Sequence, residues 1–118
     1  MNDLPQEWEL LSFFETEPQL EDPHVPWCYN RLTFDSLCSD GRIHCVIEPG
    51  YGMFKLQWTQ GAVERLSVSL HNILSMVYRR EEGIETLEVI SRDTHLLPFR
   101  FSLRPTVRFV WGTSSRIV

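Results

Sequence analysis

The feature that most constrains the fold is a change of hydrophobic period at Tyr29. From this residue onward apolar and polar side chains alternate, as in strands with one buried face. Turn signals rich in Gly, Pro or Asp separate the alternating runs about every ten residues. We therefore predict an antiparallel meander of seven or eight strands that curls on itself. The expected strands span residues 31–37, 42–47, 54–58, 66–70, 74–78, 84–90, 97–103 and 107–111.

The segment before the meander carries helix signals. Asp3 can act as the N-cap, with Gln6 as its capping-box partner. The helix should end by Thr16, because the residue before Pro18 favours extended geometry. We expect this amphipathic helix to cover the apolar side of the sheet, which gives an α+β fold. Its apolar arc is formed by Trp8, Leu10, Leu11, Phe13 and Phe14.

Residues 17–28 contain three prolines, which exclude a helix or a central strand. This stretch is therefore predicted to be an ordered, extended connection. A chain of 118 residues is expected to form one domain. We divide it into an acidic helix with a proline-rich connection (1–28), an antiparallel sheet (29–112) and a short tail (113–118).

Negative charge is concentrated at the amino end. Residues 1–30 hold seven acids and no Lys or Arg, a formal charge of −7. Residues 31–118 hold nine acids and eleven bases, a charge of +2, so the chain carries −5 in total. This asymmetry bears on the choice of partner and on association rate rather than on the fold. It favours a basic partner and disfavours a dedicated nucleic-acid binder.

Cysteine usage and the first residues indicate the compartment. Cys28, Cys38 and Cys45 are odd in number and form no Cys-x-x-Cys pair, so we expect small buried thiols rather than disulfides. The amino terminus lacks the basic region of a secretory signal, and no apolar run approaches the ~20 residues of a membrane span. We therefore expect a cytoplasmic protein without membrane contact.

The sequence gives no specific indication of a metal site, a cofactor or a reaction. His24 and Cys28 stand four apart, but the prolines between and beside them prevent a shared helical face. His44 and Cys45 are adjacent and should point to opposite sides of a strand. No local signature of a catalytic nucleophile is present. We predict no metal, no cofactor and no enzymatic activity.

A basic strip near the carboxyl end suggests a different use. Arg100, Ser102 and Arg104 should share the face opposite Phe99, Phe101 and Leu103 if the strand alternates regularly. With Arg108, this strip would suit a phosphate backbone. The simpler interpretation is that these arginines pair across strands with Glu85 or Glu88. No aromatic residue on the same face is placed to stack on bases.

An acidic helix followed by a meander is the layout of this chain, and two segments are typical of it. They are EPQLEDPHVPWCYNRLTF at 17–34 and LPFRFSLRPTVRFVWGT at 97–113. In this layout the chain resembles the immunity proteins of bacterial polymorphic and contact-dependent toxin systems. The resemblance implies tight binding to a cognate toxin domain, often a basic nuclease, at or beside its active site. No residue role carries over by position, because immunity proteins differ in fold.

The leading hypothesis is a non-enzymatic inhibitor that binds a cognate toxin or another basic protein. Carboxylates would steer the partner and pair with its cations, while Trp27 and Tyr29 would be buried anchors. The predicted partner-binding residues are Glu7, Glu9, Glu15, Glu17, Glu21, Asp22, Trp27 and Tyr29.

A second hypothesis is a small-molecule carrier or small enzyme with an apolar pocket inside the curled sheet. Such a pocket would be lined by Phe54, Trp58, Phe101 and Trp111, with His44 or His71 at its mouth. A third is a nucleic-acid module that uses the arginine strip, which the overall negative charge disfavours.

Overall fold

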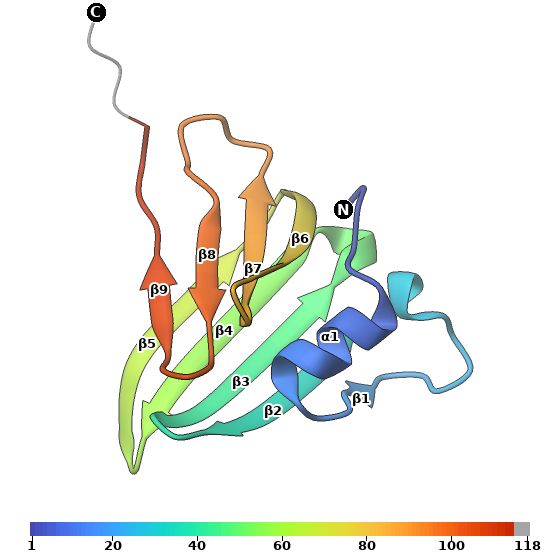
Figure 1. The fold of residues 1–118 in the computed structure, drawn as a ribbon. Coiled ribbons are helices and arrows are strands. Elements are labelled where there is room, and N and C mark those ends of the chain that lie inside the picture. Colours follow the sequence, from blue (N-terminus) through green and yellow to red (C-terminus); the bar gives the residue numbers. More distant parts are fainter. Residues whose placement is uncertain (115–118) are drawn as a thin grey trace, which may run out of the picture.

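The computed structural model describes residues 1–114, which form one α-helix, two short 3-10 helices and nine strands in two antiparallel sheets (Figure 1). Within this part of the chain, no helix has the length and apolar character required to cross a membrane. The elements are α1 (Glu7–Phe14), β1 (Gln19–Leu20), η1 (Trp27–Tyr29), β2 (Leu32–Cys38), β3 (Gly41–Glu48), η2 (Pro49–Tyr51), β4 (Met53–Gln60), β5 (Val63–Leu70), β6 (Ile73–Glu81), β7 (Ile84–Ser91), β8 (Phe99–Ser102) and β9 (Arg108–Val110).

The strands follow one another as neighbours, as a meander requires. The five-stranded sheet has the order β1-β2-β3-β4-β5, and the four-stranded sheet has the order β6-β7-β8-β9. The α+β class and the antiparallel meander of seven or eight strands after residue 29 are confirmed, and the strands are β2–β9. The chain passes from one sheet to the other between β5 and β6, at His71 and Asn72. The extra strand β1 lies in the proline-rich connection and pairs only at the edge, beside β2.

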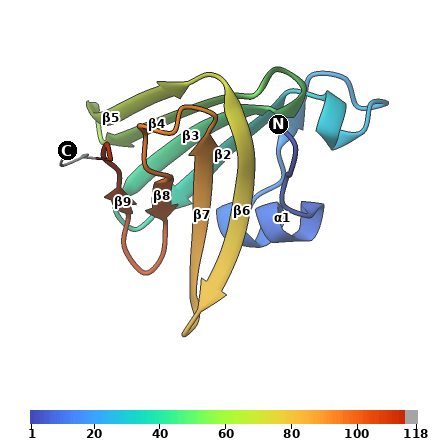
Figure 2. The same ribbon diagram turned by 90° about the horizontal axis from the view of Figure 1, so that it is seen from above.

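The core lies between the two sheets, where their inward faces meet. Phe54 on β4 contacts Phe99 and Phe101 on β8, with ring centroids 5.9 and 5.8 Å apart. Helix α1 closes the open side of this sandwich (Figure 2). Phe14 stacks on Phe34 of β2 at 4.2 Å, and Phe13 meets Phe101 edge-on at 5.2 Å. The helix therefore ties the two sheets together through apolar burial, the dominant favourable term in folding.

The start of the helix differs from the prediction. Gln6, not Asp3, is the N-cap, and its backbone N–H donates to Glu9 Oε1 at 2.8 Å. Asp3 instead extends beside β6, where its carbonyl accepts from Met76 N–H at 2.9 Å and it bridges Ser75. Pairing with β6 holds the first residues extended and moves the helix start downstream. The predicted end is confirmed, since Glu15 is the C-cap in a left-handed conformation.

The predicted tail begins within ordered pairing. Thr113 forms an antiparallel bridge with Leu96, and Ser114 N–H donates to His95 O at 2.8 Å. These contacts lie before the start of β8 and after the end of β9 and continue the antiparallel arrangement of the two strands. The rest of the predicted tail, 115–118, lies outside the described residues.

Candidate functional site

The carboxyl end of α1 is held by a residue from the far end of the chain. Arg104 Nη1 donates to the Phe13 carbonyl at 2.8 Å, and its Nε lies 3.0 Å from Glu15 Oε2. Ser36 Oγ donates to the Phe14 carbonyl at 2.6 Å. A cation is favourable at this end, where the last carbonyls have no partner within the helix. Glu15 is therefore paired internally, and the position of the helix end is fixed.

The proline-rich connection is held by one buried side chain, Asn30. Its Nδ2 donates to the carbonyls of Asp22 and Val25 at 2.6 and 3.0 Å. Its Oδ1 accepts from the backbone N–H groups of Arg31 and Asp22 at 2.9 and 3.3 Å. All four bonds go to backbone groups, which would otherwise need water. Residues 21–31, which contain η1 but are otherwise irregular, are thereby held in one conformation.

The six predicted carboxylates fall into two groups. Glu9 caps the helix start and Glu15 pairs with Arg104. The others are exposed and form no ion pair with any residue between 1 and 114. They lie on α1 and on the connection around β1, on the side of the molecule away from β5 and β9 (Figures 1 and 2). We call this group the acidic surface: Glu7, Glu17, Glu21 and Asp22.

The two predicted aromatic anchors differ in exposure. Trp27 is half-buried and packs edge-on against Phe34, with ring centroids 6.3 Å apart. Tyr29, two residues later on η1, is 77% exposed. Trp8 on α1 is also exposed and meets Tyr78 edge-on at 6.0 Å. Tyr29 thus offers most of its ring to a partner, whereas much of Trp27 is already used in the fold.

Tyr51 was missed as a candidate. It is 84% exposed on η2, the short helix that packs beside η1 (Figure 1). The turn is held by Pro49 O, which accepts from Gly52 N–H at 3.2 Å and from the Met1 ammonium at 3.0 Å. Gly52 has φ +60, and an added Cβ would approach the Ile73 backbone to 3.0 Å. A tyrosine between two glycines in a tight turn has no neighbour to bury it, and that signal was available in the sequence.

The carboxyl-terminal arginines do not form one strip. Arg100 Nε lies 3.4 Å from Glu88 Oε1, which is the predicted cross-strand pair. Glu88 is buried and also receives Arg79 Nε at 2.8 Å. Arg104 was expected on the same face, but β8 ends at Ser102 and the Arg104 side chain turns to the helix. Arg104 therefore departs from the strand alternation, because its side chain donates hydrogen bonds to the carbonyls at the end of α1.

The residues proposed to line an internal pocket lie elsewhere or contact one another. Phe54 and Phe101 are fully buried in mutual contact. Trp58 Nε1 donates to the Asp40 carbonyl at 2.9 Å, and Trp111 is 45% exposed. His44 lies on the outer face of β3, where its Nδ1 is 2.7 Å from Asp35 Oδ1, and His71 is exposed. Aromatic rings thus occupy the space where the second hypothesis placed a ligand.

The titratable groups of the interior are few. Burial raises the pKa of the Cys45 thiol well above its ordinary value, which keeps it protonated and unreactive. Cys38 is half-buried, whereas Cys28 is exposed, contrary to the expectation of a buried thiol. Partial burial, together with its hydrogen bond to Glu85, raises the pKa of Tyr78. Residues 1–114 contain no group of three or more His, Cys, Asp or Glu side chains arranged to hold a metal ion.

Comparison with known proteins identifies a solved structure that has the same fold. No family model and no curated protein sequence matches the chain. Among solved structures, it matches a chain of the "Contact-dependent growth inhibition toxin - immunity protein complex from Klebsiella pneumoniae 342" with a TM-score of 0.78 and 18% identity. The match covers 96% of this chain and 97% of that one. The resemblance suggested by the sequence is thus confirmed at the level of the fold, which the two chains share over nearly their whole length.

Proposed function

We propose that this chain is an immunity protein, a non-enzymatic binding module that neutralises a cognate toxin domain in the cytoplasm. The observation that carries the proposal is the fold match, over nearly the full length of both chains, to a chain of a toxin–immunity complex. Fold alone does not fix function, so the choice of surface rests on the residues.

The acidic surface supports a basic partner. Glu7, Glu17, Glu21 and Asp22 are exposed, and no cation of residues 1–114 neutralises them through an ion pair. Nucleases bind a polyanion and therefore present Lys and Arg around their active sites. Carboxylates on a rigid surface can occupy the positions that phosphates would take. We therefore propose a nuclease domain as the partner and its basic active-site region as the surface that is blocked.

Tyr29 and Tyr51 supply the apolar part of this interface. Tyrosine is enriched among the residues that dominate binding energy, because a large ring is buried with only two torsions to fix. Their helices, η1 and η2, pack side by side and are held by Asn30 and by the Pro49 carbonyl. A pre-organised surface loses less entropy on binding. Glu9, Glu15 and Trp27 have structural contacts, and we assign them to the support of this surface.

The proposal is tested by co-expression in Escherichia coli with the toxin domain encoded directly upstream in the native genome. The toxin domain alone should arrest growth, and the chain should restore it. The variant in which Glu17, Glu21 and Asp22 are changed to Lys should protect less well at equal protein level. Growth arrest that persists with abundant, folded wild-type chain would contradict the proposed function.

A further inference from the structure

The outer face of the four-stranded sheet carries both signs of charge, and its arginines gather toward β8 and β9, beyond the buried Glu88. Pairing of Leu87 with Phe101, and of Phe101 with Phe109, directs these side chains inward. Their neighbours on β7, β8 and β9 must then point outward. No helix or strand of residues 1–114 lies over this face in either view (Figures 1 and 2). The outward residues are Ile84, Thr86, Glu88, Arg100, Ser102, Arg108 and Val110.

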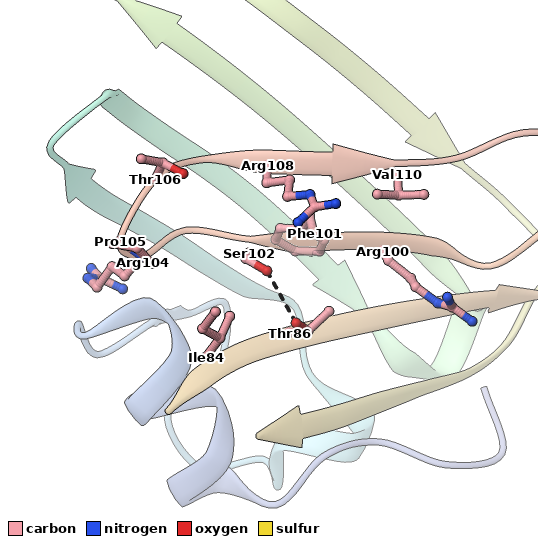
Figure 3. Close-up of a pocket in the computed structure, with 10 residues that line it drawn as sticks. All are labelled: Ile84, Thr86, Arg100, Phe101, Ser102, Arg104, Pro105, Thr106, Arg108 and Val110. Atoms are coloured by element: carbon pink, nitrogen blue, oxygen red, sulfur yellow. Dashed lines mark hydrogen bonds between the residues drawn. The ribbon is translucent and has the colours of Figure 1, made fainter. Parts of the chain in front are cut away.

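A shallow pocket of about 310 Å³ lies on this face, and three arginines but no acid are among its ten lining residues (Figure 3). Arg108 extends over the middle of the group, whereas Arg100 and Arg104 point toward opposite ends. Between them, Thr86 and Ser102 share a hydrogen bond of 3.2 Å. The pocket is therefore locally cationic on a chain whose net charge is −5.

The three arginines differ in how many donors remain. Arg104 is used by the end of α1 and by Glu15. Arg100 directs Nε to Glu88, and no hydrogen bond within residues 1–114 uses its two terminal nitrogens. Arg108 is exposed and has no ion pair or side-chain hydrogen bond within residues 1–114. Because Ser102 pairs with Arg108 and Arg100 with Val110, the two available arginines are diagonal neighbours, with Cα atoms ~7–8 Å apart.

The surroundings of this pair define the ligand. Arg100 is already paired with one acid, Glu88, whereas Arg108 has no ion pair within residues 1–114, so its charge is available to an incoming anion. A carboxylate matches the planar guanidinium fork. The rim is aliphatic, since Ile84 and Val110 are 45% and 49% exposed. No outward side chain of β7, β8 or β9 is aromatic, so bases would find no ring to stack on. An extended acidic segment of a protein fits this combination better than a nucleic acid does.

We infer that this pocket binds an extended, acidic segment of a protein partner, with one carboxylate on Arg108, a second within reach of Arg100, and an apolar side chain against Ile84 and Val110. Alternate side chains of an extended segment point the same way, so a Glu-x-Glu or Glu-apolar pattern would follow the sheet surface. This surface is independent of the acidic surface, and the inference does not rest on the proposed function.

The test uses nuclear magnetic resonance of the full, ¹⁵N-labelled chain titrated with the peptide acetyl-Glu-Leu-Glu-Ser-Glu-amide. We expect shifts of the Nε–H signals of Arg100 and Arg108 and of the β8 and β9 amides. Removing one charge-assisted contact in Arg108→Gln should weaken binding about tenfold. The matched control is Arg65→Gln, an exposed arginine on β5 of the other sheet, and it should bind as the wild type does.

Three results would overturn the inference. The first is equal weakening of peptide binding in Arg108→Gln and Arg65→Gln, which indicates general charge attraction. The second is a stronger response of β8 and β9 to a short oligouridylate or to inorganic phosphate than to the peptide. The third is no response to the peptide, the oligouridylate or phosphate. Since Arg108 is exposed, the spectrum of Arg108→Gln should overlay that of the wild type away from β8 and β9, which separates loss of binding from loss of fold.

Discussion

The acidic surface and the outer face of the four-stranded sheet both expose charged groups, but the two regions balance them differently. On the sheet, the buried carboxylate of Glu88 receives Arg79 and Arg100 from its two neighbouring strands. On the acidic surface, Glu7, Glu17 and Glu21 meet no cation from residues 1–114. Internal ion pairs reduce the charge that a partner can use. The informative quantity is therefore the charge that remains after internal pairing, not the charge counted along the sequence.

Arg104 and Arg108 show the same contrast within one residue type. They lie four positions apart, yet Arg104 fixes the end of α1, whereas Arg108 lies exposed on the sheet and forms no ion pair with any residue from 1 to 114. The acidic surface needs such fixed points because it consists largely of irregular chain. Asn30 and Arg104 serve the surface by holding its backbone, without any need to contact a partner.

The largest expected effect is that of Asn30→Ala. The change leaves up to four backbone groups of the connection without their partner, and we expect a loss of about 3 kcal/mol in the free energy of unfolding. Urea denaturation measures it, with the exposed Asn2→Ala as the control. A loss no larger than that of the control would show that Asn30 does not hold the surface.

Arg104→Ala should destabilise the fold by about 2 kcal/mol, because two helix carbonyls and Glu15 lose a charged donor. Arg108→Ala should change stability by no more than about 0.5 kcal/mol, as expected for an exposed residue. Thermal and urea denaturation of the two variants give the comparison directly. Equal effects would contradict the division into structural and free arginines.

Tyr51→Ala should weaken binding to the cognate toxin domain about tenfold, or ~1.4 kcal/mol, with unchanged stability because the side chain is 84% exposed. Leu37→Ala is the matched control, since Leu37 is 76% exposed on β2 away from η1 and η2. Titration calorimetry measures both affinities. If wild-type chain does not bind, the proposed function fails; if only the Tyr51 effect is absent, the assignment of the anchor fails.

The smallest effect concerns the contact between α1 and β6–β7. Tyr78 OH and Ser12 Oγ both donate to Glu85 Oε2 at 2.6 Å, so Tyr78→Phe should cost about 0.5–1 kcal/mol at neutral pH. Because the folded-state pKa of Tyr78 is raised from 10.0, its contribution is complete below that value and is lost as pH rises through the folded pKa. Stability should therefore fall less steeply above pH 10.0 in the variant than in the wild type. An identical dependence of stability on pH in the variant and the wild type would contradict the contribution assigned to the Tyr78 hydroxyl.

Much of the fold follows from local pattern, and much of the site does not. Alternation from Tyr29 onward predicted β2–β9, because a strand with one buried face must alternate. The division into two sheets at His71 and Asn72 was not predicted, since a turn between sheets resembles a turn within one. Asp3 failed as a cap because its backbone pairs with β6, about seventy residues away in the sequence.

The sequence predicted which residues belong to the site, but not which of them are paired internally or buried. Six of the seven acids found by the charge count were predicted to bind a partner, but the pairing of Glu15 with Arg104 depends on tertiary structure. Sequence context indicates the exposure of an aromatic side chain better than its residue type does. Trp27 packs on Phe34, whereas Tyr51, between two glycines in a turn, has the more exposed ring.

The most direct test of the account is the rate of association with the cognate toxin domain, measured by stopped flow at low and high ionic strength. Reversal of Glu17, Glu21 and Asp22 to Lys should slow association at low salt at least tenfold and flatten its salt dependence, because steering comes from charges that the chain leaves unpaired. The matched control reverses Glu64, Glu81 and Glu82, which are exposed elsewhere, and should have a much smaller effect. Equal rates for the two triple variants would contradict the central claim that the amino-terminal carboxylates form the docking surface.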